Sequence, residues 1–328
     1  MAVVPRLVST IIPVFNRPDQ LPEAVASVTQ QNYRPIEIII VDDGSTDGLT
    51  LATAQRLAEA CPGIIRFATQ KNGGPGVARE HGRQLAQGEF IQYLDSDDIL
   101  LPHKFDRQVA ALTESPDADV AYGKTRYRHE DGRVEPDAWK GSGTRRATMF
   151  PEFLNERWWD TPNPLYRASI CLKAGPWSEL RLEEDWEYDC RVAARGGNLV
   201  WVPAFVCEVR AHGGERLSRG SNDDSQRMQT RARSHSLIWQ HALEAGLPDS
   251  APQAVGNFAR SLFLLSRQCG AAGLPYESKE LLALAKTAAA GGVARKIDMK
   301  LYEILAMCIG WCAAGRFAAW LDQTRGNR

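Results

Sequence analysis

Short apolar runs and longer amphipathic segments alternate along the first hundred residues of the chain. The runs are rich in branched and aromatic residues, as buried strands are, and the segments between them carry apolar residues at helical spacing. Strands that alternate with helix-length connections indicate a parallel sheet joined by right-handed crossovers. The pattern predicts strands at 7–14, 36–41, 64–68 and 90–94, and helices at 18–31, 49–60 and 77–86.

Two of the predicted strands end abruptly in carboxylates. The run at 36–41 leads into Asp42-Asp43, and the run at 90–94 leads into Asp95-Ser96-Asp97-Asp98. Neighbouring carboxylates repel each other, and a divalent cation such as Mg²⁺ or Mn²⁺ removes that penalty while it holds substrate phosphates. We therefore predict a metal–diphosphate site at the carboxyl ends of these strands, where open α/β sheets bind ligands. A solvated acidic turn that caps the next helix is the alternative.

The middle of the chain carries weaker signals. A helix is expected at 105–113, and strands are expected at 120–122, 200–202 and 205–209. The pair Trp158-Trp159 cannot face one core from a regular strand, so we expect one buried ring. The other ring would lie at the surface, where it could form a platform for an acceptor sugar or have no functional role.

The pattern changes to helices at about residue 224. Helical spacing covers 225–245, 251–272, 275–290 and 297–323, with Gly and Pro between the segments. We predict an α/β catalytic domain at 1–224 and a helical domain at 225–328. The last segment is apolar nearly all round from Ile304 to Ala314, but it is too short for a bilayer span.

Composition and charge narrow the class of protein. The chain has 328 residues, 44% hydrophobic and 24% charged, as in soluble globular proteins, and its net charge of −1 argues against general nucleic-acid binding. Residues 1–224 carry a net −7 and residues 225–328 a net +6. The basic part would suit peripheral contact with an anionic membrane, but packing against the catalytic domain or a second subunit is preferred.

Targeting signals and cysteines bear on the compartment. The first residues do not have the pattern of a signal peptide. Seven scattered cysteines without a CxxC pair indicate reduced, mostly buried thiols. We therefore expect a cytoplasmic protein, with the inner face of the membrane as its alternative place.

Several segments together resemble the family-2 glycosyltransferases with the GT-A fold. The resemblance covers about residues 7–215 and rests on STIIPVFNRPDQLPEAVASVTQQNY, EIIIVDDGSTDG, KNGGPGVARE, GEFIQYLDSDDILLP, LEEDWEYDCR and VRAHGG, in the family's order. Each segment is common by itself, but this many in order are specific. The resemblance implies a Rossmann-like, mostly parallel sheet flanked by helices, and inversion at the anomeric carbon.

The resemblance also implies roles for single residues. Asp97 would bind the metal, and His212 in the VRAHGG segment would be its second protein ligand. Asp185, with Glu184 beside it, would act as general base on the acceptor hydroxyl. The alternative is that these carboxylates only stabilise the first turn of a helix through the helix dipole. The nucleotide would contact the remaining positions, namely Pro13, Phe15, Asn16, Asp43, Lys71, Gly73, Asp95 and Ser96.

The expected activity follows from these roles. A hexosyltransferase would move a sugar from a nucleotide donor, UDP-linked by expectation, to a hydroxyl of a glycan, glycolipid or glycoprotein, with Mn²⁺ or Mg²⁺ as cofactor. Surface polysaccharide or glycoconjugate assembly would be its setting, by analogy alone. The alternatives are a non-catalytic nucleotide-sugar-binding relative and a sugar nucleotidyltransferase. The last should carry a Gly-rich loop where Pro13-Val14-Phe15-Asn16 stands.

Overall fold

The computed structural model describes residues 3–211, 224–289 and 296–326, and it divides into two compact units. Each unit combines segments from different parts of the chain. The first contains Met1–Met149, Arg157–Glu179 and Arg195–Gly214. The second contains Phe150–Glu156, Leu180–Ala194 and Glu215–Arg328.

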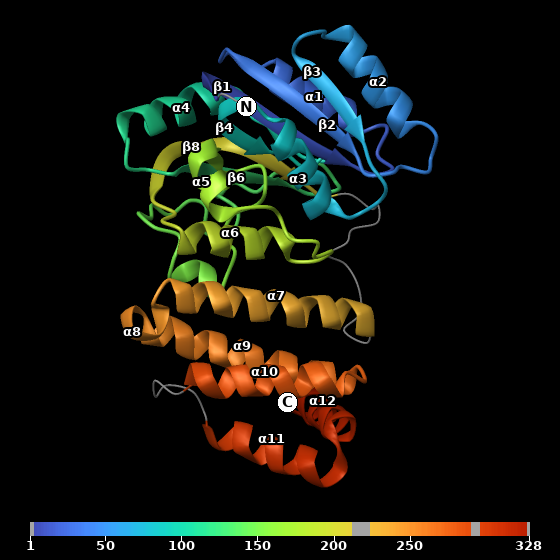
Figure 1. The fold of residues 1–328 in the computed structure, drawn as a ribbon, viewed down its shortest axis with the longest axis vertical. Coiled ribbons are helices and arrows are strands. Elements are labelled where there is room, and N and C mark those ends of the chain that lie inside the picture. Colours follow the sequence, from blue (N-terminus) through green and yellow to red (C-terminus); the bar gives the residue numbers. More distant parts are fainter. Residues whose placement is uncertain (1–2, 212–223, 290–295, 327–328) are drawn as a thin grey trace. The chain divides into compact units, whose positions relative to one another are not determined.

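The first unit is built on one mixed sheet of eight strands among the described residues, in the order β3-β2-β1-β4-β7-β6-β8-β5 (Figure 1). Pairing is parallel among β3, β2, β1 and β4 and between β6 and β8, whereas β7 and β5 pair antiparallel with their neighbours. The predicted mostly parallel sheet is thus confirmed. The strands are β1 (Val4–Val14), β2 (Ile36–Asp42), β3 (Ile65–Thr69), β4 (Gly88–Tyr93), β5 (Ile99–Leu100), β6 (Val120–Arg128), β7 (Leu165–Arg167) and β8 (Leu199–Arg210).

Helices cover both faces of this sheet because its central strands are apolar on both sides. Alternate residues of β1 and β2, such as Val8 and Ile38, join one core cluster with the apolar faces of α1, α2 and α4. The residues between them face α3, where Gly82 lies so close to Ile11 that a Cβ would stand 2.4 Å from its Cγ2 atom. The helices are α1 (Leu21–Thr29), α2 (Thr50–Ala60), α3 (Pro75–Leu85), α4 (Lys104–Glu114) and α5 (Ala168–Ala174).

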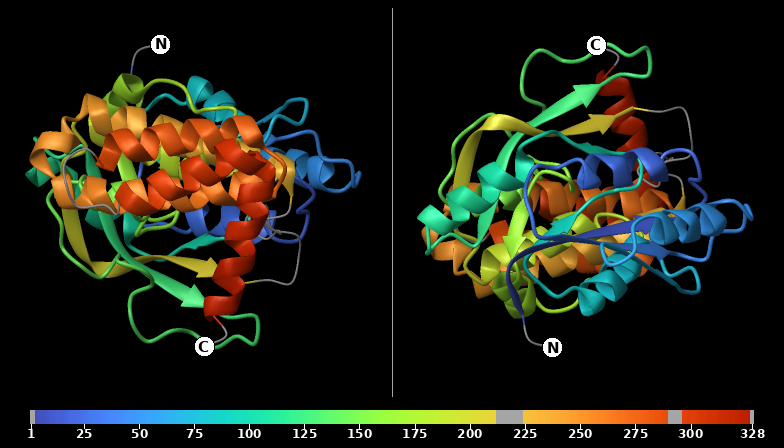
Figure 2. Two further views of the ribbon diagram at one scale, coloured as in Figure 1. Left: turned by 90° about the horizontal axis from the view of Figure 1, so that it is seen from below. Right: turned by 90° about the horizontal axis from the view of Figure 1, so that it is seen from above.

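The second unit is helical. Its helix α9 packs against α7, α10 and α12, and α6 packs on α7 (Figures 1 and 2). The elements are η1 (Glu152–Leu154), α6 (Glu184–Ala194), α7 (Ser225–Glu244), α8 (Leu247–Ser250), α9 (Pro252–Ala271), α10 (Pro275–Ala288), α11 (Lys296–Ile309) and α12 (Trp311–Gly326). The C-terminal helical region is therefore confirmed.

One expected helix is divided. The single helix predicted for 297–323 is wrong, because the chain turns at Gly310 between α11 and α12. Gly310 has a φ of 86°, in the left-handed region that glycine enters without a steric penalty. The apolar run around it hid the break, since such a run fits a continuous buried helix equally well.

The tryptophan pair also differs from expectation. Trp158 and Trp159 are both buried, at 2% and 0% exposure. Both rings pack against Tyr122, at centroid distances of 5.0 and 5.7 Å, and against each other at 4.6 Å. The segment is irregular rather than a strand, so its successive side chains need not point to opposite faces. The surface position expected for one of the two rings is therefore wrong.

The cysteines and the helix lengths agree with the sequence. All seven cysteines are free thiols, and Cys171, Cys190, Cys207 and Cys269 are buried. Across the ranges that the structure describes, every helix is too short or too polar to cross a membrane.

Candidate functional site

The carboxyl ends of β1, β2 and β4 meet at one edge of the sheet. These strands are adjacent and parallel, with Val14 opposite Asp42 and Ile11 opposite Tyr93. The segments that follow them therefore lie together, and each carries residues that the sequence predicts for nucleotide or metal binding. Figure 1 shows this edge where the loops after the blue strands approach the loop before α3.

Asp43 anchors the loop that precedes α3. Its Oδ1 atom accepts hydrogen bonds from Gln70 Nε2 and Gly73 N, both at 2.8 Å, and its Oδ2 atom accepts one from Gly74 N at 2.8 Å. Asp43 is 4% exposed. A carboxylate so placed fixes the loop after β3 against the loop after β2.

A glycine makes this close approach possible. Gly44 has a φ of +74°, and a Cβ there would stand 2.8 Å from Asn72 N. Of the predicted loop residues, Gly73 is thus held by Asp43, whereas the Lys71 side chain is exposed. The exposed ammonium group of Lys71 is available to an anionic ligand, whereas Gly73 N and Gly74 N already donate to Asp43.

The exit from β1 is tied to the loop after β2. Asn16 has a φ of 51°, and its Oδ1 accepts hydrogen bonds from Thr46 N at 2.8 Å and Asp47 N at 3.3 Å. Pro13 is buried within β1, and Phe15 is 42% exposed. The structure thus brings these three predicted residues to the same edge, with Phe15 as an exposed aromatic ring.

Two arginines hold the carboxylates that follow β4. Arg79 Nη2 lies 2.6 Å from Asp95 Oδ1, and the Arg79 side chain is only 4% exposed. Arg17 Nη1 lies 2.7 Å from Asp97 Oδ2, and both of these side chains are about one-fifth exposed. The predicted metal ligand thus carries an ion pair that a cation would have to share or displace.

Asp98 is the most deeply placed carboxyl of the segment. It is 6% exposed, and its Oδ1 accepts a hydrogen bond from Arg210 N at 3.1 Å. Burial raises its pKa well above the ordinary value, and the charges of Asp97 and Asp95 raise it further. Burial and like charge thus both disfavour a third ionised carboxylate in this turn. Ser96, within the same turn, is buried as well.

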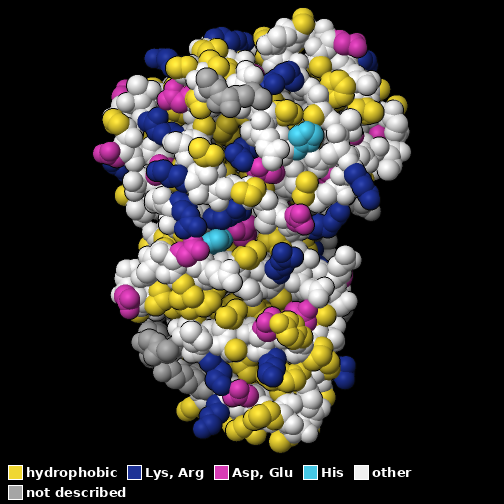
Figure 3. Space-filling view, in the orientation of Figure 1, with side chains coloured by type: hydrophobic (Ala, Val, Ile, Leu, Met, Phe, Trp, Pro, Cys, Tyr) yellow, Lys and Arg dark blue, Asp and Glu magenta, His cyan; other side chains and the backbone are white. Residues whose placement is uncertain are grey.

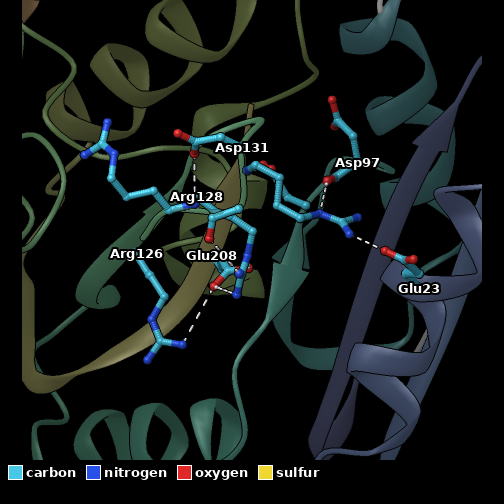
Figure 4. Close-up of polar contacts among 10 residues, drawn as sticks. Glu23, Asp97, Arg126, Arg128, Asp131 and Glu208 are labelled. Atoms are coloured by element: carbon cyan, nitrogen blue, oxygen red, sulfur yellow. Dashed lines mark hydrogen bonds and ion pairs between the residues drawn. The ribbon is translucent and has the colours of Figure 1, made fainter. Parts of the chain in front are cut away.

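Arg210 at the end of β8 closes the other side of the acidic turn. Its Nε donates to the backbone oxygen of Asp97 at 2.8 Å, and its guanidinium also pairs with Glu23 (Figure 4). Two residues earlier on β8, the buried Glu208 forms an ion pair with Arg128, whose Nε lies 2.6 Å from Glu208 Oε1. Arg126 Nη1 lies 3.7 Å from Glu208 Oε2. The Glu208 pairs join β8 to β6, and Arg210 holds the end of β8 against the acidic turn.

The donor set at this edge fits a hard cation. Asp97 is the partly exposed carboxylate of a cluster in which burial, and after it like charge, raises the pKa of Asp98, so a divalent cation beside these carboxylates would relieve repulsion. Within the described residues, no group of three or more His, Cys, Asp or Glu side chains stands ready to hold a metal. Substrate phosphates commonly complete such shells. The other predicted ligand, His212, lies outside the described residues.

The predicted general base lies in the second unit. Glu184 and Asp185 begin α6, where Glu184 is buried and Asp185 is half-buried. Asp185 Oδ1 accepts a hydrogen bond from Trp186 N at 2.7 Å. Both residues lie in the second unit, at the start of the helix that packs on α7.

Sequence reasoning missed the basic partners of the acidic motifs. Arg17, Arg79 and Arg210 each contact the segment after β4, but they come from three other parts of the chain. The only local signal was their placement next to recognised motifs: Arg17 follows Asn16, and Arg79 falls in KNGGPGVARE.

Comparison with known proteins identifies the family. The sequence profile described as glycosyl transferase family 2 matches residues 9–172, half of the chain. The chain belongs to glycosyl transferase family 2. Family and fold are thus as expected, and membership in a family of glycosyltransferases counts against a nucleotidyltransferase. Inversion stays a prediction.

A curated relative and two solved structures extend the comparison. An uncharacterized glycosyltransferase, RC0461 of Rickettsia conorii, is 37% identical over 137 residues, 40% of this chain but only 22% of its own length. The S. aureus TarS fragment solved with UDP-GlcNAc superposes with a TM-score of 0.60 at 20% identity, covering 92% of each chain. A Pyrobaculum calidifontis mannosyltransferase solved with GDP-Man and Mn²⁺ superposes with a TM-score of 0.52 at 18% sequence identity. The match covers 98% of this chain and 88% of the mannosyltransferase chain. At these identities the two structures support the GT-A-like fold alone.

Proposed function

We propose that the protein transfers a sugar from a UDP-linked donor to an acceptor hydroxyl with inversion, in surface polysaccharide or glycoconjugate assembly. The observation that carries this proposal is the edge of the sheet where the segments after β1, β2 and β4 meet, with the acidic turn of Asp95, Asp97 and Asp98 directly after β4. The solved neighbours that hold UDP-GlcNAc, or GDP-Man with Mn²⁺, support a nucleotide sugar as donor.

In this proposal the sheet edge binds the donor. Asp97, together with His212, would hold Mn²⁺ or Mg²⁺, which supplies positive charge for the departing diphosphate when bound. Arg17 lies next to that position and offers a second positive group. Phe15, Asn16 and the loop anchored by Asp43 would hold the nucleoside, with Lys71 and Ser96 near the phosphates. Pro13, Gly73 and Asp95 shape this edge.

The second part of the proposal concerns the acceptor. A sugar hydroxyl is a weak nucleophile at neutral pH, so its proton must leave as the bond to the anomeric carbon forms. We assign that proton transfer to Asp185, with Glu184 beside it. Direct displacement by the activated oxygen would invert the anomeric carbon. A nucleotide-sugar-binding relative that lacks transfer is the alternative.

One pair of variants tests both parts. Release of the nucleoside diphosphate is measured with Mn²⁺ for UDP-GlcNAc, UDP-glucose, UDP-galactose (as UDP) and GDP-mannose (as GDP), and the best donor is kept. Asp97→Asn should weaken Mn²⁺-dependent donor binding at least about tenfold by calorimetry, because a ligand carboxylate is lost. Asp185→Asn should leave binding intact and lower release about 100-fold or more, the range of general-base catalysis.

The matched control is Asp117→Asn, at an exposed aspartate just before β6, away from the carboxyl edge of the sheet. It should change neither quantity. Wild-type release in Asp185→Asn would remove the base assignment, and unchanged metal dependence in Asp97→Asn would remove the metal assignment. Donor binding without release by the wild-type protein would favour the non-catalytic alternative.

Peripheral association is a separate part of the proposal. Helix α11 exposes large apolar side chains, among them Ile297 at 74%, Leu301 at 60% and Met307 at 68%. Figure 3 shows hydrophobic side chains at the surface of the helices of this unit. An apolar stripe on a helix in a basic region suits an anionic membrane surface, and a second copy of the chain would cover it equally well.

A further inference from the structure

Helix α7, far along the chain, holds the acidic start of α6 at two points. Arg231 Nε donates to Glu183 Oε1 at 3.0 Å, and His235 Nδ1, which also lies 3.1 Å from Arg231 O, lies 3.2 Å from Glu183 Oε2. One helical turn after Glu183, His241 Nε2 lies 2.8 Å from Glu187 Oε1. Asp185 lies between the two anchored glutamates in the sequence.

The first anchor holds a backbone conformation that glutamate rarely adopts. Glu183 has a φ of 59°, in the left-handed region, which costs roughly 1–2 kcal/mol for a residue with a Cβ. Glycine or asparagine would fit this turn more easily. The ion pair with Arg231 gives a reason for a glutamate at this position, because only an acidic side chain can form it.

The charge state of Glu183 agrees with this role. Burial alone would raise the pKa of Glu183, but the hydrogen bonds and charges of His235 and Arg231 lower it below the ordinary value. The carboxylate is thus ionised at neutral pH and pairs with the guanidinium of Arg231. Its side chain is 23% exposed, so water screens the pair only in part.

The second anchor, the contact between Glu187 and His241, is more deeply buried than the first. The Glu187 side chain is 3% exposed, and it also receives Arg191 Nε at 3.0 Å from its own helix. Because Arg191 remains as a partner when His241 is removed, we expect the His241 contact to matter less than the Arg231 contact. A buried carboxylate that is held by a partner on another helix fixes the relative register of the two helices, since an unpaired buried charge would be costly.

Between the anchors, Trp186 is fixed by the same surroundings. Its indole Nε1 donates to Phe153 O at 2.6 Å, and its ring meets the His235 ring edge-on at 5.3 Å. The His235 ring in turn stacks on Phe258 of α9 at 5.8 Å. The first turn of α6 therefore rests on a continuous set of contacts from α7 and α9.

We propose that α7 positions the general base: Arg231 and His235 hold Glu183, His241 holds Glu187, and together they fix the first turn of α6 and the direction of Asp185. This inference rests on the assignment of Asp185 as base under the proposed function. Arg231, His235 and His241 are positioning residues, because they act through α6 and not on the substrate. The C-terminal helices would then be part of the catalytic apparatus.

The test uses the full chain and the donor that wild type consumes fastest in the panel above. Arg231→Met keeps the aliphatic packing and removes the ion pair. It should lower kcat for release of the nucleoside diphosphate at least about tenfold, while the KM for the donor changes less than about twofold, because donor binding is assigned to the sheet edge. Arg231→Lys should recover part of the loss, and His241→Gln should lower kcat only a few-fold.

The matched control is Arg233→Met, at an exposed arginine two residues along the same helix, which should behave as wild type. The deciding readout is a double-mutant cycle. If Arg231 acts through Asp185, Arg231→Met has no further effect on the residual rate of Asp185→Asn. A purely structural role would lower the rate by the same factor in both backgrounds, and that result would overturn the inference.

The outcomes separate this inference from the function it rests on. Inactive Asp185→Asn with fully active Arg231→Met rejects the positioning role and leaves the base assignment standing. Active Asp185→Asn rejects the base assignment, and the positioning role falls with it. No release by wild type from any donor of the panel rejects the proposed activity and this inference together.

Discussion

Lys104 is buried at 0% exposure inside the first unit, and replacing it with methionine should change how stability depends on pH. Its Nζ donates to Gln108 Oε1 and to Asn163 O, both at 2.6 Å. Burial lowers the pKa of Lys104 from 10.5 to about 7. Between these two values the unfolded chain binds a proton that the folded protein does not.

The sign and size of the effect follow from proton linkage. Because the unfolded state binds more protons between pH 7 and 10.5, the free energy of unfolding rises with pH by about 1.4 kcal/mol per unit. From pH 7.5 to 9.5 the wild type should gain about 2.5 kcal/mol relative to Lys104→Met. The hydrogen bonds lost in the variant add an offset that does not depend on pH, since neither acceptor titrates.

Urea denaturation at a series of pH values measures this difference, because other titrations are common to both proteins and cancel. Nearby Cys207 does not interfere, since burial raises the pKa of its thiol to about 12. Lys173→Met, at an exposed lysine of α5, is the control and should show no slope against wild type. A difference between wild type and Lys104→Met that stays flat, or falls, as pH rises would refute the assignment of a buried neutral amine.

Two further outcomes are expected from exposed or shared contacts. Arg17→Met should raise the affinity of the nucleotide-free protein for Mn²⁺ several-fold by calorimetry, because the guanidinium 2.7 Å from Asp97 competes with the cation; weaker Mn²⁺ binding would contradict that competition. The double variant Ile297→Glu with Leu301→Glu should abolish flotation with anionic liposomes without lowering Tm, since both side chains are exposed and the added negative charges oppose binding. Flotation equal to wild type would exclude this stripe as the membrane contact, and absence of flotation by wild type would exclude the contact itself.

The sheet was predictable because its strands carry their own signal. Nearly every residue at 36–41 is β-branched and apolar, which is the pattern of a strand covered on both faces, and β2 forms there. Adjacency of β1, β2 and β4 then places the residues after each strand at one edge. The grouping of Asn16, Asp43 and Asp97 follows from that topology.

The side-chain partners were not predictable, because they depend on contacts between distant segments. The carboxylate of Asp43 is a conspicuous candidate for ligand binding, yet both its oxygens accept hydrogen bonds from residues 70–74. Nothing in the local sequence distinguishes an aspartate that binds a loop from one that awaits a ligand. The division at Gly310 was hidden for a related reason, since apolar periodicity continues on both sides of it.

The acidic motifs therefore cannot be judged without their basic partners. Counted by sequence alone, the turn after β4 carries three like charges that call for a cation; in the structure Arg79 and Arg17 already offset two of them. The third, Asp98, is buried, and its pKa is raised first by that burial and then by the charges of Asp97 and Asp95. A cation is thus favoured less by the number of carboxylates in the sequence than by how far the arginines have already offset them, and the response of Mn²⁺ affinity to Arg17→Met measures how the two kinds of positive charge compete.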